Sequence, residues 1–418
     1  MKRFLGLVVV VGIISIMIVG FPLCTSAQEA DVIRLGVMYD LTGKGSSLGV
    51  KEMDAAKLAI NEINAQGGAN FGGKRVKIEP VYQDSETTPK VAARKMEAMI
   101  RDNKITALVG GTFAHVAIAM NSQAKKTPIL YCSSCSMPEK IFTPKEKGPY
   151  TISTMIPAES VGAGAASYVA ERMKLKDIVV CLPDYAWGQA MNRGIERVFK
   201  KIPGIKYTTI WTPLGAEDMK PYLAEALKAK PQIIMMGQWG NDGIRILKQA
   251  HEMDVIQKTK IFYNWIVDVY ATSIPPEALQ GVTCQMFWYH SMKGLGIKSI
   301  AKAVNDFTAK YRKVYNEPPD PYATSAYMGV NEIIRGMELA KSTDPAKAYR
   351  ALMANPKWNS PKGPGKWMKD GITRYKFSAF IAVGLGAKSR KDPKYDYARV
   401  ITLYTSKWFQ KTPEELGW

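Results

Sequence analysis

The amino-acid sequence predicts an α/β protein made of two doubly wound lobes, each built on a parallel sheet. The first observation is length, because 418 residues are more than one ordinary hydrophobic core holds together. The second is an alternation of short apolar segments with amphipathic helical segments, which runs through part of the chain and then starts again. The third is composition, since 46% hydrophobic and 22% charged residues are typical of a globular chain.

The first 27 residues have the pattern of a secretory signal peptide. Basic residues stand at positions 2 and 3, an apolar stretch covers 4–21, and Thr25-Ser26-Ala27 favours cleavage after about Ala27. The alternative is an uncleaved membrane anchor, because the apolar stretch is close to spanning length. A lipoprotein signal at Cys24 is disfavoured, because a leucine directly precedes that cysteine. We therefore expect export and a periplasmic location.

Strand and helix signals alternate from residue 32 to residue 131. Runs of β-branched and apolar residues predict strands, and apolar residues three and four positions apart predict helices. Pro89 stands at the first position of a helix, where proline is favoured. The predicted strands are 32–39, 76–83, 106–110 and 129–131, and the predicted helices are 49–65, 89–102 and 115–125.

The same alternation begins again after a crossover segment at 149–157. The predicted strands are 178–182, 207–211, 232–236 and 260–263, and the predicted helices are 188–200, 220–228 and 242–253. Each series therefore predicts its own doubly wound sheet. Ligands bind such sheets beyond the carboxyl ends of the strands, so the loops after the strands are the candidate site.

The last third of the chain has a less regular pattern. Residues 360–371 are rich in Gly, Pro and Lys, which predicts a loop. Helices are expected over 299–315, 322–340 and 344–353, and strands near 374–385 and 399–404.

Basic residues outnumber acidic ones and give a formal charge of +20, but they are scattered along the chain. Nucleic-acid-binding proteins concentrate such charge in a stripe or a motif, so we expect no nucleic-acid partner. One interpretation is a solvated basic surface. The other is attraction of an anionic ligand or of an anionic membrane surface.

Four cysteines follow the leader segment, at positions 132, 135, 181 and 284. The spacing of Cys132 and Cys135 fits a local disulfide in an oxidising compartment, or alternatively two buried thiols. A zinc site would need a second pair of ligands, and the chain has only three histidines. We therefore expect neither a metal nor a cofactor.

Several stretches together resemble the type I periplasmic binding proteins of ABC importers, in particular the branched-chain amino acid (leucine-binding) group. The longest is LGVMYDLTGKGSSLGVKEMDAAKLAINEINAQGG, and it is followed by ALVGGTFAHVAIAM, PILYCSSCSMPE, VVCLPDYAWGQA and IIMMGQWGNDGIRILKQA. No single motif is decisive, but their order and spacing over roughly 32–385 are specific. The resemblance implies two lobes joined by three hinge crossings, which close on a small ligand and deliver it to a membrane ABC permease.

The resemblance also divides the chain. We expect residues 28–150 and about 290–360 to form lobe one. Residues 151–289 and about 361–418 are expected to form lobe two and the hinge. We expect a monomer without catalytic residues.

The family's ligand-contacting positions fall in the loops after the strands. In lobe one a backbone N–H at a helix start and two serine hydroxyls suit an anionic group, although serines are also ordinary turn residues. In lobe two three tryptophans each follow a strand end, where a core filler would more often lie inside a strand or helix. The candidate ligand contacts are Ala114, Ser134, Ser136, Tyr185, Trp187, Trp239 and Trp265.

Trp265 is the informative departure from the family pattern. The resemblance implies an acidic residue there in the amino-acid binders, where it holds the ligand's ammonium group. Burying an ammonium without a partner costs several kcal/mol, enough to abolish micromolar binding. Either Asp184, Asp242 or Asp268 replaces that acid, or the ligand has no ammonium and is an aromatic or apolar carboxylate or amide.

Two other functions compete with the carrier. An exported enzyme is one, but Gly162-Ala-Gly164-Ala-Ala-Ser167 lacks the third glycine of a dinucleotide fingerprint, and a Cys135–His115 nucleophile pair is less simple than a disulfide. A ligand-binding sensory module is the other, because the same fold serves receptors. A receptor would normally carry a membrane span or an output domain of its own.

Overall fold

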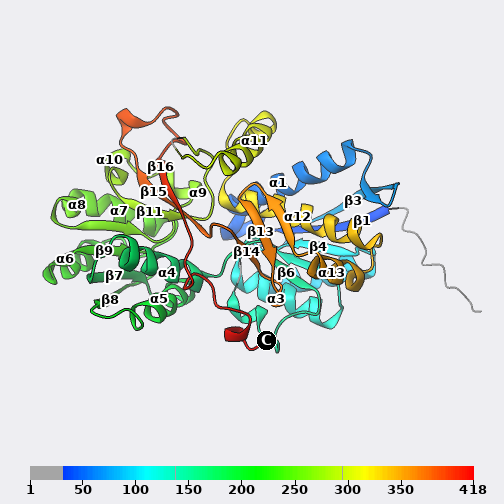
Figure 1. Cartoon of the computed structure of the whole chain (residues 1–418), viewed down its shortest axis with the longest axis horizontal. Helices are drawn as coiled ribbons and strands as arrows, with labels where there is room; N and C mark the ends of the chain where they lie inside the picture. The colour runs from blue at the N-terminus through cyan, green and yellow to red at the C-terminus, as the bar shows by residue number, and fades with distance from the viewer. Residues whose placement is uncertain (1–31, 137, 294) are drawn as a thin grey trace, which may run out of the picture.

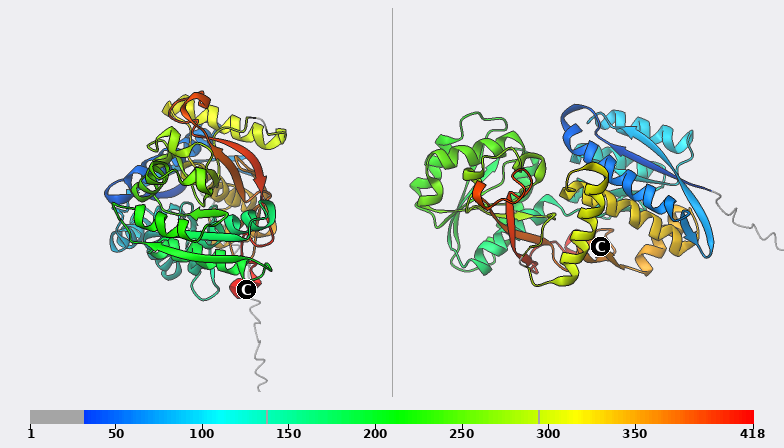
Figure 2. Two further views of the ribbon diagram at one scale, coloured as in Figure 1. Left: turned by 90° about the vertical axis from the view of Figure 1, so that its left-hand side faces the viewer. Right: turned by 90° about the horizontal axis from the view of Figure 1, so that it is seen from above.

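The computed structural model describes residues 32–136, 138–293 and 295–418 and shows two α/β lobes side by side (Figure 1). The view from above separates the same two bodies (Figure 2). The predicted two-lobed α/β fold is therefore confirmed. The leader segment 1–27 lies outside the described residues. Within the described ranges, no helix is long and apolar enough to cross a membrane.

Lobe one is built on a six-stranded sheet. All neighbouring strands are parallel except the hairpin of the first two in the spatial order. The central strands are buried along their whole length, as expected for a parallel sheet covered on both faces. In spatial order the strands are β2 (Ala69–Phe71), β3 (Lys74–Asp84), β1 (Val32–Tyr39), β4 (Ala107–Gly110), β5 (Leu130–Ser133) and β6 (Thr151–Ser153). Its first helices are α1 (Ser46–Ala65), α2 (Pro89–Arg101) and α3 (Ala114–Lys126).

Lobe two has a seven-stranded sheet with a parallel core and two antiparallel strands at one edge. In spatial order the strands are β16 (Ala398–Tyr404), β15 (Ala379–Gly384), β11 (Thr283–Met286), β10 (Lys260–Tyr263), β9 (Ile233–Met236), β7 (Asp177–Pro183) and β8 (Lys206–Thr212). Its helices are α4 (Ala158–Ser167), α5 (Ala186–Phe199), α6 (Lys220–Lys228), α7 (Asn241–Glu252), α8 (Val255–Lys258), α9 (Asp268–Ala271) and α10 (Pro276–Leu279).

In both lobes a helix start packs very closely against the end of a strand. The helix that follows the first strand of each lobe carries a glycine directly over the end of that strand. A Cβ at Gly49 of α1 would lie 2.0 Å from the backbone oxygen of Asp40, and one at Gly188 of α5 would lie 2.0 Å from that of Pro183. Only glycine permits this approach, which holds each helix start close to its strand end.

The helices α11 (Lys298–Tyr315), α12 (Pro321–Ala340) and α13 (Pro345–Ala354) return the chain to lobe one. The α12 helix packs along α1 and contacts β4 and β5. From α11, the Lys310 ammonium pairs with Glu62 of α1 at 3.0 Å.

Residues 357–375 differ from their predicted form. The expected loop over 360–371 is part of a three-stranded antiparallel sheet of β12 (Lys357–Ser360), β13 (Gly363–Trp367) and β14 (Thr373–Tyr375). Residues 363–367 alternate between buried and exposed, as in a strand, although Gly and Pro in this segment are typical of a loop. Gly365 packs under the indole of Trp358. The Trp367 indole donates to Glu332 of α12 at 2.5 Å, so this sheet lies against lobe one, and the indole of Trp288, which follows β11, donates to the backbone oxygen of Pro361 at 3.1 Å.

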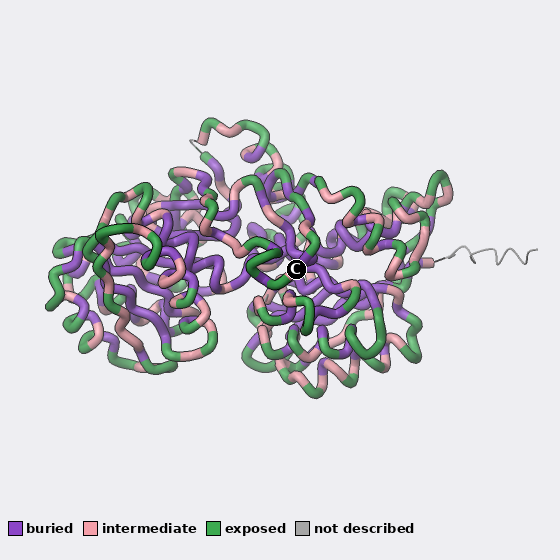
Figure 3. Tube along the Cα trace, turned by 60° about the horizontal axis from the view of Figure 1, so that its bottom comes forward, coloured by how far each residue is buried: buried purple, intermediate pink, exposed green. Residues whose placement is uncertain are grey.

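The chain passes between the lobes three times before its last segment, after β6, after β11 and after β14. The C-terminal segment 405–418 adds a fourth passage, which the sequence did not suggest (Figure 1). Arg197 of α5 donates to the backbone oxygen of Trp408 at 2.6 Å in lobe two, and Trp418 donates to the backbone oxygen of Phe142 at 2.8 Å in lobe one. We call residues 405–418 the C-terminal strap. Buried residues run through both lobes and the region between them (Figure 3).

Candidate ligand-binding site

A cavity of about 640 Å³ lies between the lobes. Its walls are the loops and helix starts that follow β4 and β5 in lobe one and β7, β9 and β10 in lobe two. This is the carboxyl edge of both sheets, where doubly wound folds bind ligands. The volume fits a small organic molecule.

The wall of lobe one offers donors to an anionic group. Helix α3 begins at Ala114, and no side chain caps its first turn. Its first N–H groups and the positive end of its dipole therefore remain available at the cavity. Ala114 and Ser136 both line the cavity, as does the hydroxyl-bearing Thr112.

Ser134 is the one predicted contact that does not line the cavity. Its side chain is fully buried, and its hydroxyl shares a 2.7 Å hydrogen bond with the phenol of Tyr39. Both serines follow the end of β5 in a turn, in which the Ser133 hydroxyl donates to the backbone oxygen of Ser136 at 2.6 Å, so Ser136 lines the cavity and Ser134 lies behind it. Ser134 supports the wall from lobe one.

The wall of lobe two carries the three predicted indoles. Trp187, Trp239 and Trp265 line the cavity together with Tyr185. The Trp187 indole donates to the backbone oxygen of Gly237 at 3.2 Å, which fixes the ring beside Trp265 at a centroid distance of 6.4 Å. Helix α5 also starts here without a side-chain cap, so a second helix N-terminus faces the cavity.

Aromatic side chains from the two lobes meet over the cavity. The Phe113 ring of lobe one packs edge-on against Trp239 of lobe two at 6.2 Å between centroids. The indole of Trp265 donates to the phenol oxygen of Tyr322 on α12 at 3.3 Å. Burial raises the pKa of the Tyr322 phenol, so it stays protonated near neutral pH. Trp265 thus lies at the junction of the lobes and not sealed within one of them.

The three aspartates that could have replaced the missing acid are engaged elsewhere. Asp184 accepts from Gln189, and Asp242 accepts from the backbone of Gly215 and pairs with Arg245. None of the three is among the cavity-lining residues described.

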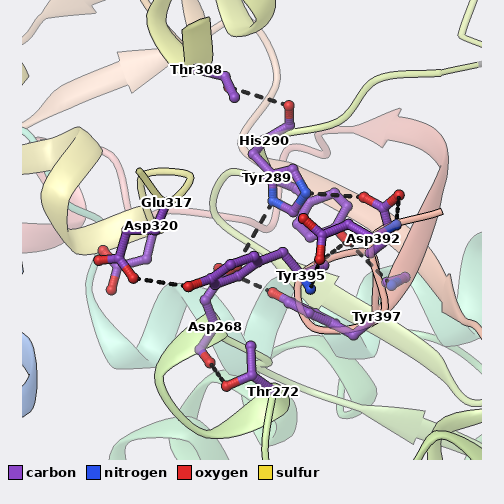
Figure 4. Close-up of polar contacts among 12 residues, drawn as sticks. Asp268, Thr272, Tyr289, His290, Thr308, Glu317, Asp320, Asp392, Tyr395 and Tyr397 are labelled. Atoms are coloured by element: carbon purple, nitrogen blue, oxygen red, sulfur yellow. Dashed lines mark hydrogen bonds and ion pairs between the residues drawn. The ribbon is translucent and has the colours of Figure 1, made fainter. Parts of the chain in front are cut away.

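Asp268 has its partners among the polar side chains around His290 and Tyr397 (Figure 4). The Tyr397 phenol donates to its Oδ2 atom at 3.1 Å, and His290 Nδ1 lies 3.8 Å from its Oδ1 atom. The same histidine contacts Asp396 at 3.3 Å through Nε2. Asp268 therefore belongs to an internal polar network of lobe two.

Two acidic side chains of the cavity wall, Glu139 and Glu159, are paired with basic side chains of the protein itself. Lys411 of the C-terminal strap lies 3.1 Å from Glu139 of lobe one and 3.0 Å from Glu159 at the start of α4. Arg197 adds a contact to Glu159 at 3.6 Å. Burial and the neighbouring Glu159 carboxylate raise the pKa of Glu139 to about 7. These acids already have cationic partners inside the protein.

Several wall residues were not among the candidates predicted from the sequence. They are Thr112, Phe113, His115, Tyr322, Lys411 and Leu416. The first three stand next to Ala114 at the end of a predicted strand, so the strand-end rule could have included them. Tyr322 and the strap residues come from distant parts of the chain, and no local pattern marks them.

The cysteines are thiols in this structure. All four are free and buried, so of the two alternatives for Cys132 and Cys135 the structure has the buried thiols. Burial and the nearby Glu52 carboxyl raise the pKa of Cys135, which is the opposite of what a nucleophile requires. Within the ranges that the structure covers, no three His, Cys, Asp or Glu side chains group as metal ligands.

Two parallel-sheet lobes that enclose a small-molecule cavity at their strand ends define a solute-binding protein. The family model described as periplasmic binding protein matches residues 32–377, and the chain belongs to this family. The family is a class of solute-binding proteins without catalytic activity, so the chain is not an enzyme.

Two relatives similar to this chain are named as amino-acid-binding proteins. A leucine-, isoleucine-, valine-, threonine- and alanine-binding protein of Pseudomonas aeruginosa is 24% identical over 336 residues, which are 79% of this chain and 84% of that protein. The Leu/Ile/Val-binding protein of Citrobacter freundii is 22% identical over 351 residues, 83% of this chain and 90% of that protein.

Solved structures show the same fold. A periplasmic binding protein from Burkholderia mallei superposes with a TM-score of 0.76 at 22% identity, covering 92% of this chain and 98% of its own. A solute-binding protein of an ABC transporter from R. palustris, in complex with benzoate, gives 0.70 at 19% identity, with 89% and 96% covered. One from Rhodopseudomonas palustris BisB5, in complex with 3,4-dihydroxy benzoic acid, gives 0.72 at 19% identity, with 90% and 97% covered.

Proposed function

We propose that this solute-binding protein captures a small aromatic or apolar carboxylate, or the corresponding amide, and not leucine. The observation that carries the proposal is the composition of the cavity. Three indoles form the wall of lobe two, and the aspartates near them are engaged elsewhere. Of the carboxylates that line the cavity, Glu139 and Glu159 pair with Lys411, and Glu415 accepts from the backbone N–H of Thr412 on the strap. An α-amino acid would leave its ammonium without a partner, at a cost of several kcal/mol.

The carboxylate end of such a ligand has suitable partners. The uncapped start of α3, the hydroxyl of Ser136 and the uncapped start of α5 offer donors and positive dipole ends. The indoles of Trp187, Trp239 and Trp265 offer flat apolar area for a ring. Two structural neighbours hold benzoate and 3,4-dihydroxy benzoic acid, which agrees with this choice.

The protein's role is delivery. In this proposal a monomer is exported to the periplasm, its leader is removed after about Ala27, its lobes close over the ligand, and the closed form docks on an ABC permease. Ala114, Ser136, Tyr185, Trp187, Trp239 and Trp265 contact the ligand, and Ser134 acts from behind the wall through Tyr39.

The test is titration calorimetry on protein that has been unfolded, dialysed and refolded to remove bound ligand. Benzoate, benzamide and leucine are added in separate experiments. The proposal expects saturable heat from benzoate or benzamide and none from leucine. Saturable binding of leucine, with no heat from either aromatic compound, would refute it. Uptake of labelled benzoate by cells with and without the gene then tests the partnership with a permease.

A further inference from the structure

A buried carboxyl group stands directly behind the wall of the cavity. Glu52 of α1 has no solvent exposure. Its Oε2 atom lies 2.6 Å from the hydroxyl of Thr112, and the Cys135 thiol also faces the carboxyl group. Thr112 and Cys135 both line the cavity. Glu52 therefore contacts the ligand site through its wall and does not contribute to its surface.

The surroundings of Glu52 favour its neutral form. The Oε1 atom is buried and has no hydrogen-bond partner, as is also true of one oxygen each on Asp40 and Asp320. Burial is the main cause that raises the pKa of Glu52 to about 8, and these two carboxyl groups add to it. Lys51, its neighbour in the chain, pairs with Glu317 instead.

The groups that face this carboxyl come from three elements of lobe one. Tyr39 and Asp40 lie at the end of β1, Tyr131 and Cys135 lie on and after β5, and Asp320 caps α12. The carboxyl groups of Asp40 and Asp320 disfavour a charge on Glu52, and the Cys135 thiol opposes this effect in part by hydrogen bonding. His115 of α3 acts on Asp40 and also lines the cavity, so its side chain is replaced in a control variant.

The proton on Glu52 decides what the Thr112 hydroxyl offers to a ligand. A hydroxyl has one proton to donate and two lone pairs. The backbone N–H of Asp40 already donates to Thr112 Oγ1 at 3.1 Å. When Glu52 is ionised, Thr112 must give its proton to Glu52 and can present only a lone pair to the cavity. When Glu52 is protonated, it can donate to Oγ1, and the proton of Thr112 is then free for a carboxylate in the cavity.

We propose that Glu52 is a positioning residue that couples anion binding to a proton, because its O–H turns the Thr112 hydroxyl into a donor at the cavity wall. This inference rests on the proposed function, in which the ligand is a carboxylate. It adds that the ligand anion and the Glu52 proton are bound together. A neutral amide ligand, which can accept or donate, depends less on that proton.

The first experiment measures the Kd of benzoate from about pH 6 to about pH 10. For the wild type we expect constant affinity at the acid end and a loss that approaches tenfold per pH unit above about pH 8. Glu52→Gln supplies an amide N–H in place of the O–H and should bind benzoate with no pH dependence. Thr112→Val removes the hydroxyl and should bind benzoate weakly at all these pH values. The controls His115→Gln and Glu139→Gln remove other titratable side chains of the cavity and should keep the loss of affinity above about pH 8.

A second experiment needs no ligand. The infrared spectrum of the free protein at about pH 7 should contain the carbonyl band of a buried protonated carboxyl group that is absent in Glu52→Gln and disappears above about pH 8. Absence of this band overturns the proposal. So does a Glu52→Gln variant with the wild-type pH slope. If the band is present but benzoate gives no heat at any pH, the proposed ligand class fails, and its coupling to Glu52 fails with it.

Discussion

Replacing Lys411 with methionine should destabilise the protein in a pH-dependent manner. Lys411 is the residue of the C-terminal strap that contacts an acid in each lobe, at 3.1 Å for Glu139 and 3.0 Å for Glu159. Its side chain is 26% exposed, and those of its partners are 19% and 6% exposed. Water therefore screens these pairs only partly, and each is worth about 1.5 kcal/mol at the low end for a charge-assisted hydrogen bond.

The pH dependence follows from Glu139. Its pKa is raised to about 7, so this carboxyl is ionised at about pH 8 and largely protonated at about pH 6. At the higher pH the variant loses two charged contacts, or about 3 kcal/mol. At the lower pH it loses mainly the contact with Glu159, or about 1.5 kcal/mol. Lys411 therefore stabilises the fold more as pH rises.

The assay is urea unfolding followed by tryptophan fluorescence at both pH values. The matched control is Lys407→Met, because Lys407 is exposed on the same strap. The control should change the free energy of unfolding by less than about 0.5 kcal/mol at either pH. Equal stability of Lys411→Met and the wild type, or a loss that does not depend on pH, would show that the strap does not join the lobes through these ion pairs.

The structure also predicts the effects of three further substitutions on stability or on ligand binding. Lys362→Met should raise the free energy of unfolding by about 1–3 kcal/mol at about pH 7, because burial lowers the pKa of Lys362 and so disfavours its charged form in the fold. In urea unfolding the gain should shrink toward about pH 10, and a destabilised variant would contradict this. Trp265→Ala should weaken benzoate binding by about 10- to 100-fold in calorimetry, whereas Trp211→Ala on β8 should leave the affinity unchanged. Equal effects of the two substitutions would show that Trp265 does not contact the ligand. The raised pKa of Glu52 keeps it protonated in the fold, so its contribution to stability is full below about pH 4 and is lost as pH rises to about 8. The melting temperature of Glu52→Gln should lack this pH-dependent contribution, and a pH profile of melting equal to that of the wild type would contradict a protonated Glu52.

The sequence predicted the parts of the site that depend on local order. Trp187, Trp239 and Trp265 follow strands β7, β9 and β10, and the ends of parallel strands meet at one edge of a sheet. A continued strand would point Ser134 and Ser136 to the same face, and only the turn after β5 separates them, so their placement depends on where the strand stops. Strand boundaries are the least certain part of a sequence-based assignment.

Other parts depend on contacts between distant segments. Tyr322 reaches the cavity because α12 packs along α1, and Lys411 reaches it because the strap returns to lobe one. The sheet of β12–β14 was hidden because Gly and Pro in 360–371 resemble a loop, whereas Gly365 is required beneath the Trp358 indole. The buried proton of Glu52 is likewise a property of the assembled fold, since Asp40 and Asp320 come from separate elements.

The most direct test of the account is a crystal structure with 4-bromobenzoate, in which anomalous scattering locates the bromine atom. The account predicts one bromine peak between the lobes, against the indoles of Trp187, Trp239 and Trp265, with the carboxylate toward Thr112, Ser136 and the start of α3. A bromine peak on the outer surface of one lobe, with the inter-lobe cavity occupied by an α-amino acid, would contradict it.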